Sequence, residues 1–132
     1  MVSTNRRILL IDDSPLVVDA LRDELEEDGV EVEGVADLAA IDAQELERFD
    51  LILIDVLMPA MFGDDVAMVM RRGHNVATPI VLLSSLPDPE LAARAREAGA
   101  DGFISKRSGI DAVVAEIRTW LAGGRQRRQE EV

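Results

Sequence analysis

Residues 51–59 read Leu-Ile-Leu-Ile-Asp-Val-Leu-Met-Pro, and in them four apolar residues lead into an acidic one. A continuous apolar run of this length is typical of a β-strand that is buried on both faces of a sheet. Residues 8–13, Ile-Leu-Leu-Ile-Asp-Asp, repeat the pattern. The two stretches therefore predict two central strands, each of which ends in carboxylates.

The remaining sequence alternates short apolar runs with longer stretches of helical periodicity. Such alternation predicts parallel strands joined by crossover helices. Residues 30–35 alternate apolar with charged or small residues, so this strand is expected at an edge of the sheet. Strands are expected at residues 8–11, 30–35, 51–54, 79–83 and 103–105, and helices at residues 15–28, 38–48, 64–72, 88–98 and 108–121.

Because crossovers between parallel strands are right-handed, these units predict a particular α/β fold. It is a doubly wound, five-stranded parallel sheet of order 2-1-3-4-5 with five flanking helices. Ligands bind such open sheets outside the carboxyl ends of the strands. The predicted edge strand ends without a polar group, whereas the other four strands are followed by candidate functional residues: Asp12-Asp13, Asp55, Ser84-Ser85 and Lys106.

Composition and charge favour a single cytoplasmic domain. The chain has 132 residues, and we assign residues 1–122 to one domain and residues 123–132, which lack apolar periodicity, to a flexible tail or truncated linker. The absence of cysteine excludes disulfides and thiol catalysis. No segment predicts export or membrane insertion. The net charge of −12 repels phosphates, so direct binding to nucleic acid or a membrane is not expected.

Four motifs resemble those of the receiver domain of bacterial response regulators. They are Ile-Asp-Asp, Leu-Ile-Asp-Val-Leu-Met-Pro, Leu-Leu-Ser-Ser and Ile-Ser-Lys, in this order and spacing, and the resemblance covers residues 6–122. It implies a flavodoxin-like receiver fold and a function in two-component phosphorelay signalling. The phosphoryl donor would be a sensor histidine kinase, a histidine phosphotransfer protein or a small acyl phosphate. A receiver is not an enzyme, except that it assists its own phosphorylation and dephosphorylation.

The acidic residues predict a metal site. Three carboxylates brought close together repel one another, so they require a divalent cation, and an all-oxygen ligand set suits Mg²⁺. By resemblance, Asp13 and Asp55 coordinate Mg²⁺ directly, and Asp12 acts largely through bound water. The backbone carbonyl of Leu57 supplies a further ligand in the same way.

The resemblance also assigns Asp55 as the phosphoacceptor. A carboxylate oxygen can attack phosphorus to give an aspartyl phosphate. Catalysis of this transfer consists mainly of neutralising the phosphoryl oxygens, for which Lys106 and Ser84 are the expected partners of Mg²⁺. Lys106 is the only lysine in the chain. Taken alone, Ser84 could merely cap the following helix, and a single lysine is usually a solvated surface residue.

Phosphorylation is expected to change a protein-interaction face. A new phosphoryl group would draw in the Ser84 hydroxyl, and in the family this movement is coupled to an aromatic residue at the position of Phe103. Phe103 could equally be a packing residue. We expect the fourth helix, the fifth strand and the fifth helix to form a face for a downstream partner or a homodimer. The small inward side chains of the fourth helix predict that it is loosely held.

Three positions depart from the family pattern or vary within it. Arg107 follows Lys106 where most receivers have proline, which puts the geometry of this loop in question. Leu57 and Leu86 stand two residues beyond Asp55 and Ser84, at positions that modulate attack by water on the phosphoryl group in the family. Because both are apolar, the sequence predicts a long-lived phosphoaspartate.

Other functions are compatible with parts of this pattern. The chain could be the receiver part of a longer DNA-binding regulator or output enzyme, or a pseudo-receiver scaffold that is never phosphorylated, although no key group is missing. A phosphohydrolase is disfavoured. The haloacid dehalogenase type needs a general-acid aspartate two residues after the nucleophile, where this chain has Leu57.

Overall fold

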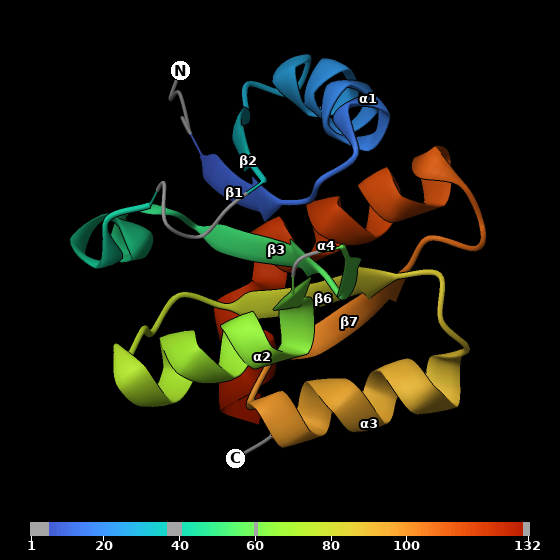
Figure 1. The fold of residues 1–132 in the computed structure, drawn as a ribbon. Helices are drawn as coiled ribbons and strands as arrows, with labels where there is room; N and C mark the ends of the chain where they lie inside the picture. The colour runs from blue at the N-terminus through green and yellow to red at the C-terminus, as the bar shows by residue number, and fades with distance from the viewer. Residues whose placement is uncertain (1–5, 37–40, 60, 131–132) are drawn as a thin grey trace.

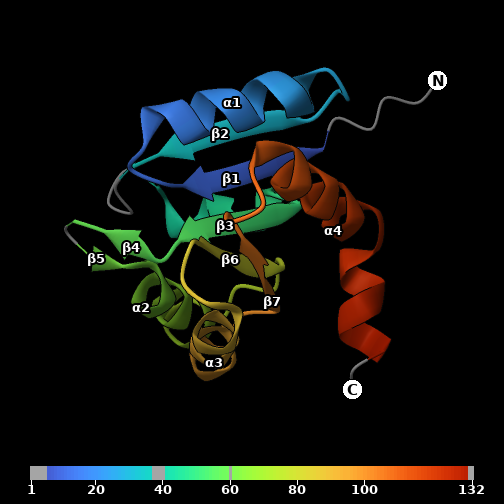
Figure 2. The ribbon, with the colours of Figure 1, turned by 90° about the vertical axis from the view of Figure 1, so that its right-hand side faces the viewer.

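A five-stranded parallel sheet forms the centre of the computed structural model, which describes residues 6–36, 41–59 and 61–130. The strand order is β2-β1-β3-β6-β7, which confirms the doubly wound order predicted from the sequence (Figures 1 and 2). β2 lies at an edge, as its alternating sequence predicted. The bounds are β1 (Arg7–Ile11), β2 (Glu31–Val35), β3 (Leu51–Asp55), β6 (Ile80–Ser84) and β7 (Gly102–Ser105).

Helices cover both faces of this sheet. In Figure 2, α1 and α4 lie over one face, and α2 and α3 lie over the other. Within the described residues, no helix is long and apolar enough to cross a membrane. The bounds are α1 (Pro15–Glu26), α2 (Gly63–Met68), α3 (Asp88–Ala98) and α4 (Ile110–Glu130).

The strands divide the core into two layers because successive side chains of a strand point to opposite faces. Leu9 and Ile54 belong to the buried cluster that packs against α2 and α3. Leu10 and Leu53 belong to the other cluster, which packs against α1 and α4. This two-sided burial explains why the central strands are apolar throughout.

The predicted helix at residues 38–48 is wrong in type and length. Residues 37–40 lie outside the described structure, and Ala43–Arg48 form a 3₁₀ helix, η2. The Asp42 side chain accepts a hydrogen bond from the backbone of Gln44 at 3.0 Å and so begins this helix. Buried apolar side chains there are Leu46 and Phe49, a spacing of three that suits a 3₁₀ turn.

The segment after β3 contains structure that the sequence pattern did not predict. Leu57–Met58 (β4) and Met61–Phe62 (β5) pair as a short antiparallel hairpin directly before α2. The helix expected at residues 64–72 is an α-helix only as far as Met68. It continues as a π-helical turn, η3, over Val69–Gly73.

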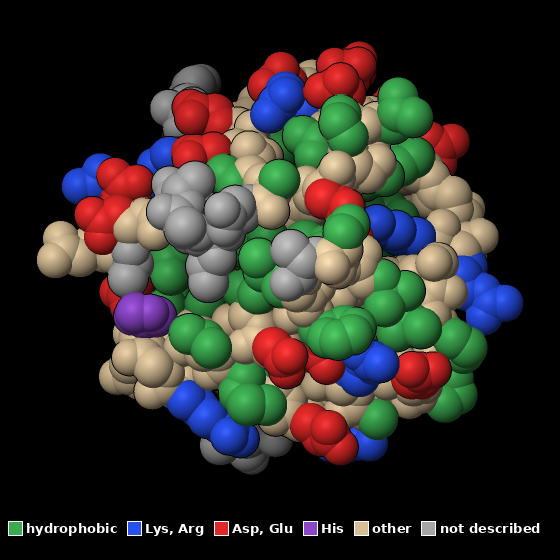
Figure 3. Space-filling view, viewed as in Figure 1, with side chains coloured by type: hydrophobic (Ala, Val, Ile, Leu, Met, Phe, Trp, Pro, Cys, Tyr) green, Lys and Arg blue, Asp and Glu red, His purple; other side chains and the backbone are tan. Residues whose placement is uncertain are grey.

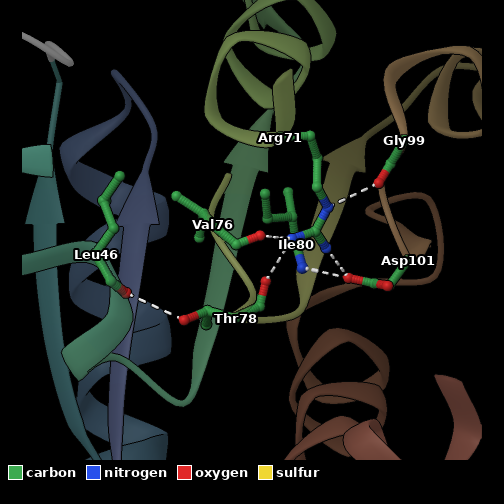
Figure 4. A network of polar contacts seen from close by, with 7 residues as sticks. All are labelled: Leu46, Arg71, Val76, Thr78, Ile80, Gly99 and Asp101. Atoms are coloured by element: carbon green, nitrogen blue, oxygen red, sulfur yellow. Dashed lines mark hydrogen bonds and ion pairs between the residues drawn. The ribbon is translucent and has the colours of Figure 1, made fainter. Parts of the chain in front are cut away.

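A buried ion pair at the opposite end of the sheet ties together the segments that flank β6. Arg71, in η3, pairs with Asp101, which precedes β7, and their side chains are 12% and 8% exposed. The Arg71 guanidinium also donates to the carbonyls of Val76, Thr78 and Gly99 (Figure 4). Asp101 in turn accepts the backbone N–H of Ile80 at 2.8 Å. The pair therefore satisfies polar groups at the end of α3 and the start of β6.

The last helix continues beyond the boundary proposed from the sequence. Helical backbone runs to Glu130, with a kink at Gly123, whose φ and ψ are −139° and 15°. Residues 124–130 thus have helical backbone in this structure. The division of the chain at residue 122 remains a prediction, and the kink lies beside it.

Candidate functional site at the carboxyl edge of the sheet

Three carboxylates meet where β1 and β3 end. Asp12 and Asp13 follow β1, and Asp55 is the last residue of β3. One carboxylate oxygen of each lies within 4.8 Å of those of the other two. Asp12 and Asp55 are only 2% and 6% exposed, whereas Asp13 is exposed. The acidic cluster predicted from the sequence therefore exists, because β1 and β3 are neighbours in the sheet.

The ammonium group of Lys106 lies between two of these acids. Its Nζ is 3.1 Å from Asp12 Oδ2 and 3.3 Å from Asp55 Oδ1. The backbone N–H of Lys106 donates to the carbonyl of Ser84 at 2.8 Å, just beyond the paired residues of β6 and β7. Lys106 is thus a partly buried site residue rather than a solvated surface lysine.

Ser84 is the last residue of β6 and is 1% exposed. Its hydroxyl oxygen accepts the backbone N–H of Leu86 at 3.1 Å. α3 begins at Asp88 after Pro87 and has no side-chain cap, so Ser84 does not cap that helix. The hydroxyl shapes the turn after β6 and keeps its own proton for donation to another acceptor.

The remaining candidate residues lie around this edge. Phe103 of β7 stands opposite Leu82 of β6 and packs, partly buried, against the cluster beneath α2 and α3. Leu86 packs against the same cluster. The side chain of Leu57 is 46% exposed. Phe103 is therefore a packing residue on the face that carries α3, a position compatible with the predicted switch.

Burial raises the pKa of the Asp55 carboxyl above its ordinary value of 3.8. The positive charge of Lys106 opposes this rise, while the negative charges of Asp12 and then Asp13 add to it. Ionised Asp55 is consequently held in an unfavourable environment when no other cation is present. A divalent cation would relieve that repulsion.

This environment predicts that Asp55→Asn stabilises the metal-free protein. The pKa of Asp55 is higher in the folded protein than in the unfolded chain. As pH rises from the unfolded-state value to the folded-state value, the wild type therefore loses stability, and above the folded-state value the loss is complete. We expect the variant to melt at a higher temperature than the wild type at about pH 7. The excess should shrink as pH falls toward 3.8, the ordinary pKa.

With Mg²⁺ added, the wild type should instead melt at a higher temperature than Asp55→Asn. A ligand present at ten times its Kd stabilises the folded state by about 1.4 kcal/mol, and this gain is expected for the wild type but is weakened without the Asp55 carboxylate. Thermal unfolding of both proteins with and without Mg²⁺ measures the effect. An Asp55→Asn variant that melts below the wild type in metal-free buffer would contradict the account.

Gly63 positions Asp55 through the backbone, which the sequence analysis missed. A Cβ on Gly63 would come within 2.7 Å of the Asp55 carbonyl carbon and closer still to its oxygen. The N–H of Gly63 also donates to the carbonyl of Val56 at 2.9 Å. Only glycine fits so close to the strand end. The signal in the sequence was a lone glycine at the end of the segment after Met58-Pro59.

The loop after Lys106 forms without proline. The N–H of Arg107 donates to the Ser105 hydroxyl at 3.1 Å, a bond that proline could not make. Gly109, with φ of +94°, donates to the carbonyl of Lys106 at 3.2 Å. Among the described residues there is no cis peptide bond. Arg107 therefore permits a turn that still brings the Lys106 ammonium to Asp55.

The donor set fits Mg²⁺. The cluster offers carboxylate oxygens from three residues, and the charge of a single ammonium does not balance them. Hard oxygen ligands of this kind are those that Mg²⁺ prefers. Asp12, Asp13 and Asp55 are therefore the residues that would hold it.

Comparisons with known proteins show which family this chain resembles. Residues 8–118 match the family described as response regulator receiver domain. The chain is 33% identical over 122 residues to the transcriptional activator protein IrlR of Burkholderia pseudomallei, covering 92% of this chain and 52% of the relative. It is 33% identical over 114 residues to the transcriptional regulatory protein PdtaR of Mycobacterium tuberculosis, covering 85% and 55%. The chain thus spans about half the length of these relatives.

Solved structures show the same fold. The chemotaxis response regulator CheY4 of Vibrio cholerae aligns with a TM-score of 0.74 and 30% identity, covering 88% of this chain and 98% of that one. A CheY-like receiver domain protein from Methanospirillum hungatei aligns with a TM-score of 0.74 at 24% identity, covering 98% and 100%. With the fold, the family match and the sequence relatives in agreement, this chain belongs to the response regulator receiver domains.

Proposed function

We propose that the chain accepts a phosphoryl group on Asp55 from a phosphohistidine or a small acyl phosphate. Family membership implies phosphorylation-based two-component signalling. The observation that carries the proposal is the arrangement at Asp55, a nearly buried carboxylate beside two further acids and 3.3 Å from the Lys106 ammonium. The donor would be a sensor histidine kinase or a histidine phosphotransfer protein.

In the proposed transfer an oxygen of the Asp55 carboxylate attacks phosphorus. A new O–P bond forms as the P–N bond of the phosphohistidine breaks, and the imidazole nitrogen keeps the bonding electrons and takes a proton. With an acyl phosphate, a carboxylate leaves instead. Lys106 can shift from the Asp55 carboxylate to a phosphoryl oxygen, and the Ser84 hydroxyl can donate to another. Mg²⁺ would supply further neutralisation of the phosphoryl oxygens.

The proposed output is a change in the face formed by α3, β7 and α4. These are the elements that the sequence predicted as the fourth helix, the fifth strand and the fifth helix. The inward side chains of α3 are Leu91, Ala95 and Ala98, so most of its buried contacts are small. A helix anchored by little apolar area is displaced at low energetic cost. A phosphoryl group that draws in Ser84 would shift the loop leading to α3 and let Phe103 move. The face would then bind a downstream partner or a second copy of the chain.

The test is incubation with acetyl phosphate and Mg²⁺, followed by intact-mass measurement. We expect one added phosphoryl group on the wild type and none on Asp55→Asn. A requirement for Mg²⁺ should appear when the metal is chelated. If the wild type remained unmodified under these conditions, the pseudo-receiver alternative would replace this proposal.

We also predict a long-lived phosphoaspartate, because apolar Leu57 and Leu86 cannot hydrogen-bond an attacking water. Leu57→Asn and Leu86→Glu each introduce a group that can orient water, so each should shorten the half-life several-fold. Loss of phosphoryl after removal of the donor measures it. Val69→Asn, at another exposed apolar position, is the control and should leave the half-life unchanged. Equal half-lives in all four proteins would refute the prediction.

The relatives suggest a larger context. One is described as the DNA-binding response regulator MtrA of Mycolicibacterium smegmatis, and the chain covers 53% of it. A receiver part of a longer regulator is therefore a second candidate, in which DNA contact would come from another domain. With a net charge of −12, we still expect no DNA binding by the receiver itself. The extent of the open reading frame distinguishes the two candidates.

A further inference from the structure

We propose that the β4–β5 hairpin transmits occupancy of the metal site to α3 through Phe62 and Arg94. The inference rests on the proposed function, since it needs a ligand at Asp55. It adds a route to α3 that is separate from Ser84 and Phe103.

Both ends of the hairpin lie next to Asp55, with no intervening loop. β4 begins with Leu57, two residues after Asp55, and the Leu57 carbonyl is an expected metal ligand. At the other end of the hairpin, Gly63 lies against the backbone of Asp55, with no room for a Cβ. Both ends are thus fixed to the segment that would adjust when a cation binds.

Inside the hairpin, Leu57 is paired with Phe62 in the antiparallel register. A movement of the Leu57 backbone is therefore passed across the pair to Phe62. Phe62 is 51% exposed, so core packing does not hold its ring in place.

Arg94 of α3 makes the contact with this ring. Its guanidinium carbon lies 5.7 Å from the centroid of Phe62, within cation–π range. Arg94 also pairs with Asp64, in the first turn of α2, at 3.5 Å. One side chain of α3 therefore contacts both the hairpin and the helix that follows it.

Asp64 is the second partner of Arg94 on this face. The Asp64 Oδ1 atom is buried without a hydrogen-bond partner in the described structure, so Asp64 depends on Arg94 for neutralisation. Over α2 and α3, acidic, basic and hydrophobic side chains lie near one another in the view of Figure 3.

The experiment is a Mg²⁺ titration of the intact chain followed by backbone amide chemical shifts, first alone and then with beryllofluoride. Phe62→Ala breaks the contact alone, and Arg94→Gln breaks it together with the ion pair to Asp64. Glu90→Gln is a matched control, because it removes only the pairing of Arg94 within α3, which has a distance of 3.4 Å. Val69→Ala is the control for loss of an exposed apolar side chain.

In the wild type, amides of α3 around Arg94 should shift with the same apparent Kd as the amide of Asp13. In Phe62→Ala and Arg94→Gln the α3 shifts should fall to less than about half, while the Asp13 shift persists and Mg²⁺ affinity changes by less than roughly fivefold. Both controls should behave as the wild type. Undiminished α3 shifts in both variants would overturn the coupling and leave the proposed function intact. Absence of any Mg²⁺-dependent shift at Asp13 would overturn both.

Discussion

Arg71→Met is expected to lower the free energy of unfolding by about 3–5 kcal/mol, the cost of removing one partner from a buried ion pair. The change leaves Asp101 charged and nearly buried, and it removes the donor to the carbonyls of Gly99 and Thr78. Such a loss is a large part of the stability of a domain of this size. Chemical denaturation followed by circular dichroism measures it.

Arg72→Met is the matched control, since Arg72 is the next residue and is exposed. It carries the same charge, so its replacement should change the free energy of unfolding by less than about 0.5 kcal/mol. Equal destabilisation by the two substitutions would mean that charge, and not the buried pair, determines the effect.

Lys106→Met is expected to slow phosphorylation by acetyl phosphate roughly 10²-fold, the cost of removing one preorganised hydrogen-bond donor from a site that stabilises developing negative charge. Two effects act together. The phosphoryl oxygens lose the ammonium group, and Asp55 loses the positive charge that opposes the rise of its pKa.

Arg107→Met controls for net charge, because Arg107 is adjacent and exposed. It should change the rate by less than roughly threefold, since a surface charge is screened by salt. Lys106→Arg should not restore the wild-type rate, because the planar guanidinium cannot occupy the position of the compact ammonium. A wild-type rate in Lys106→Met would remove Lys106 from the proposed chemistry.

Much of the sheet could be predicted because the burial of each strand determines the pattern of apolar residues within that strand. An apolar run such as Leu51–Ile54 reports burial on both faces, and the alternation of residues 30–35 reports an edge. The ends of these strands then determine where Asp12, Asp55 and Lys106 meet, since parallel strands share a carboxyl edge. The approach of Lys106 to both acids follows from topology and not from any single motif.

Other features depend on contacts between segments that are distant in the sequence, and the pattern of residues does not predict such contacts. Nothing near Arg71 indicates a partner at Asp101, and the π-helical turn that includes Arg71 has no periodic signal. The requirement for glycine at position 63 arises from the Asp55 backbone, which folds against it only in three dimensions. The 3₁₀ helix of Ala43–Arg48 was mistaken for an α-helix because its few apolar residues fit either period.

Locating the phosphoryl group on the protein tests whether Asp55 is the acceptor. The protein is treated with acetyl phosphate and Mg²⁺, reduced with borohydride to convert an acyl phosphate to a stable alcohol, and mapped by peptide mass spectrometry. We expect conversion at Asp55 alone, dependent on Mg²⁺ and strongly reduced in Lys106→Met. Conversion at another carboxylate, or at Asp55 without any need for Mg²⁺ or Lys106, would contradict it.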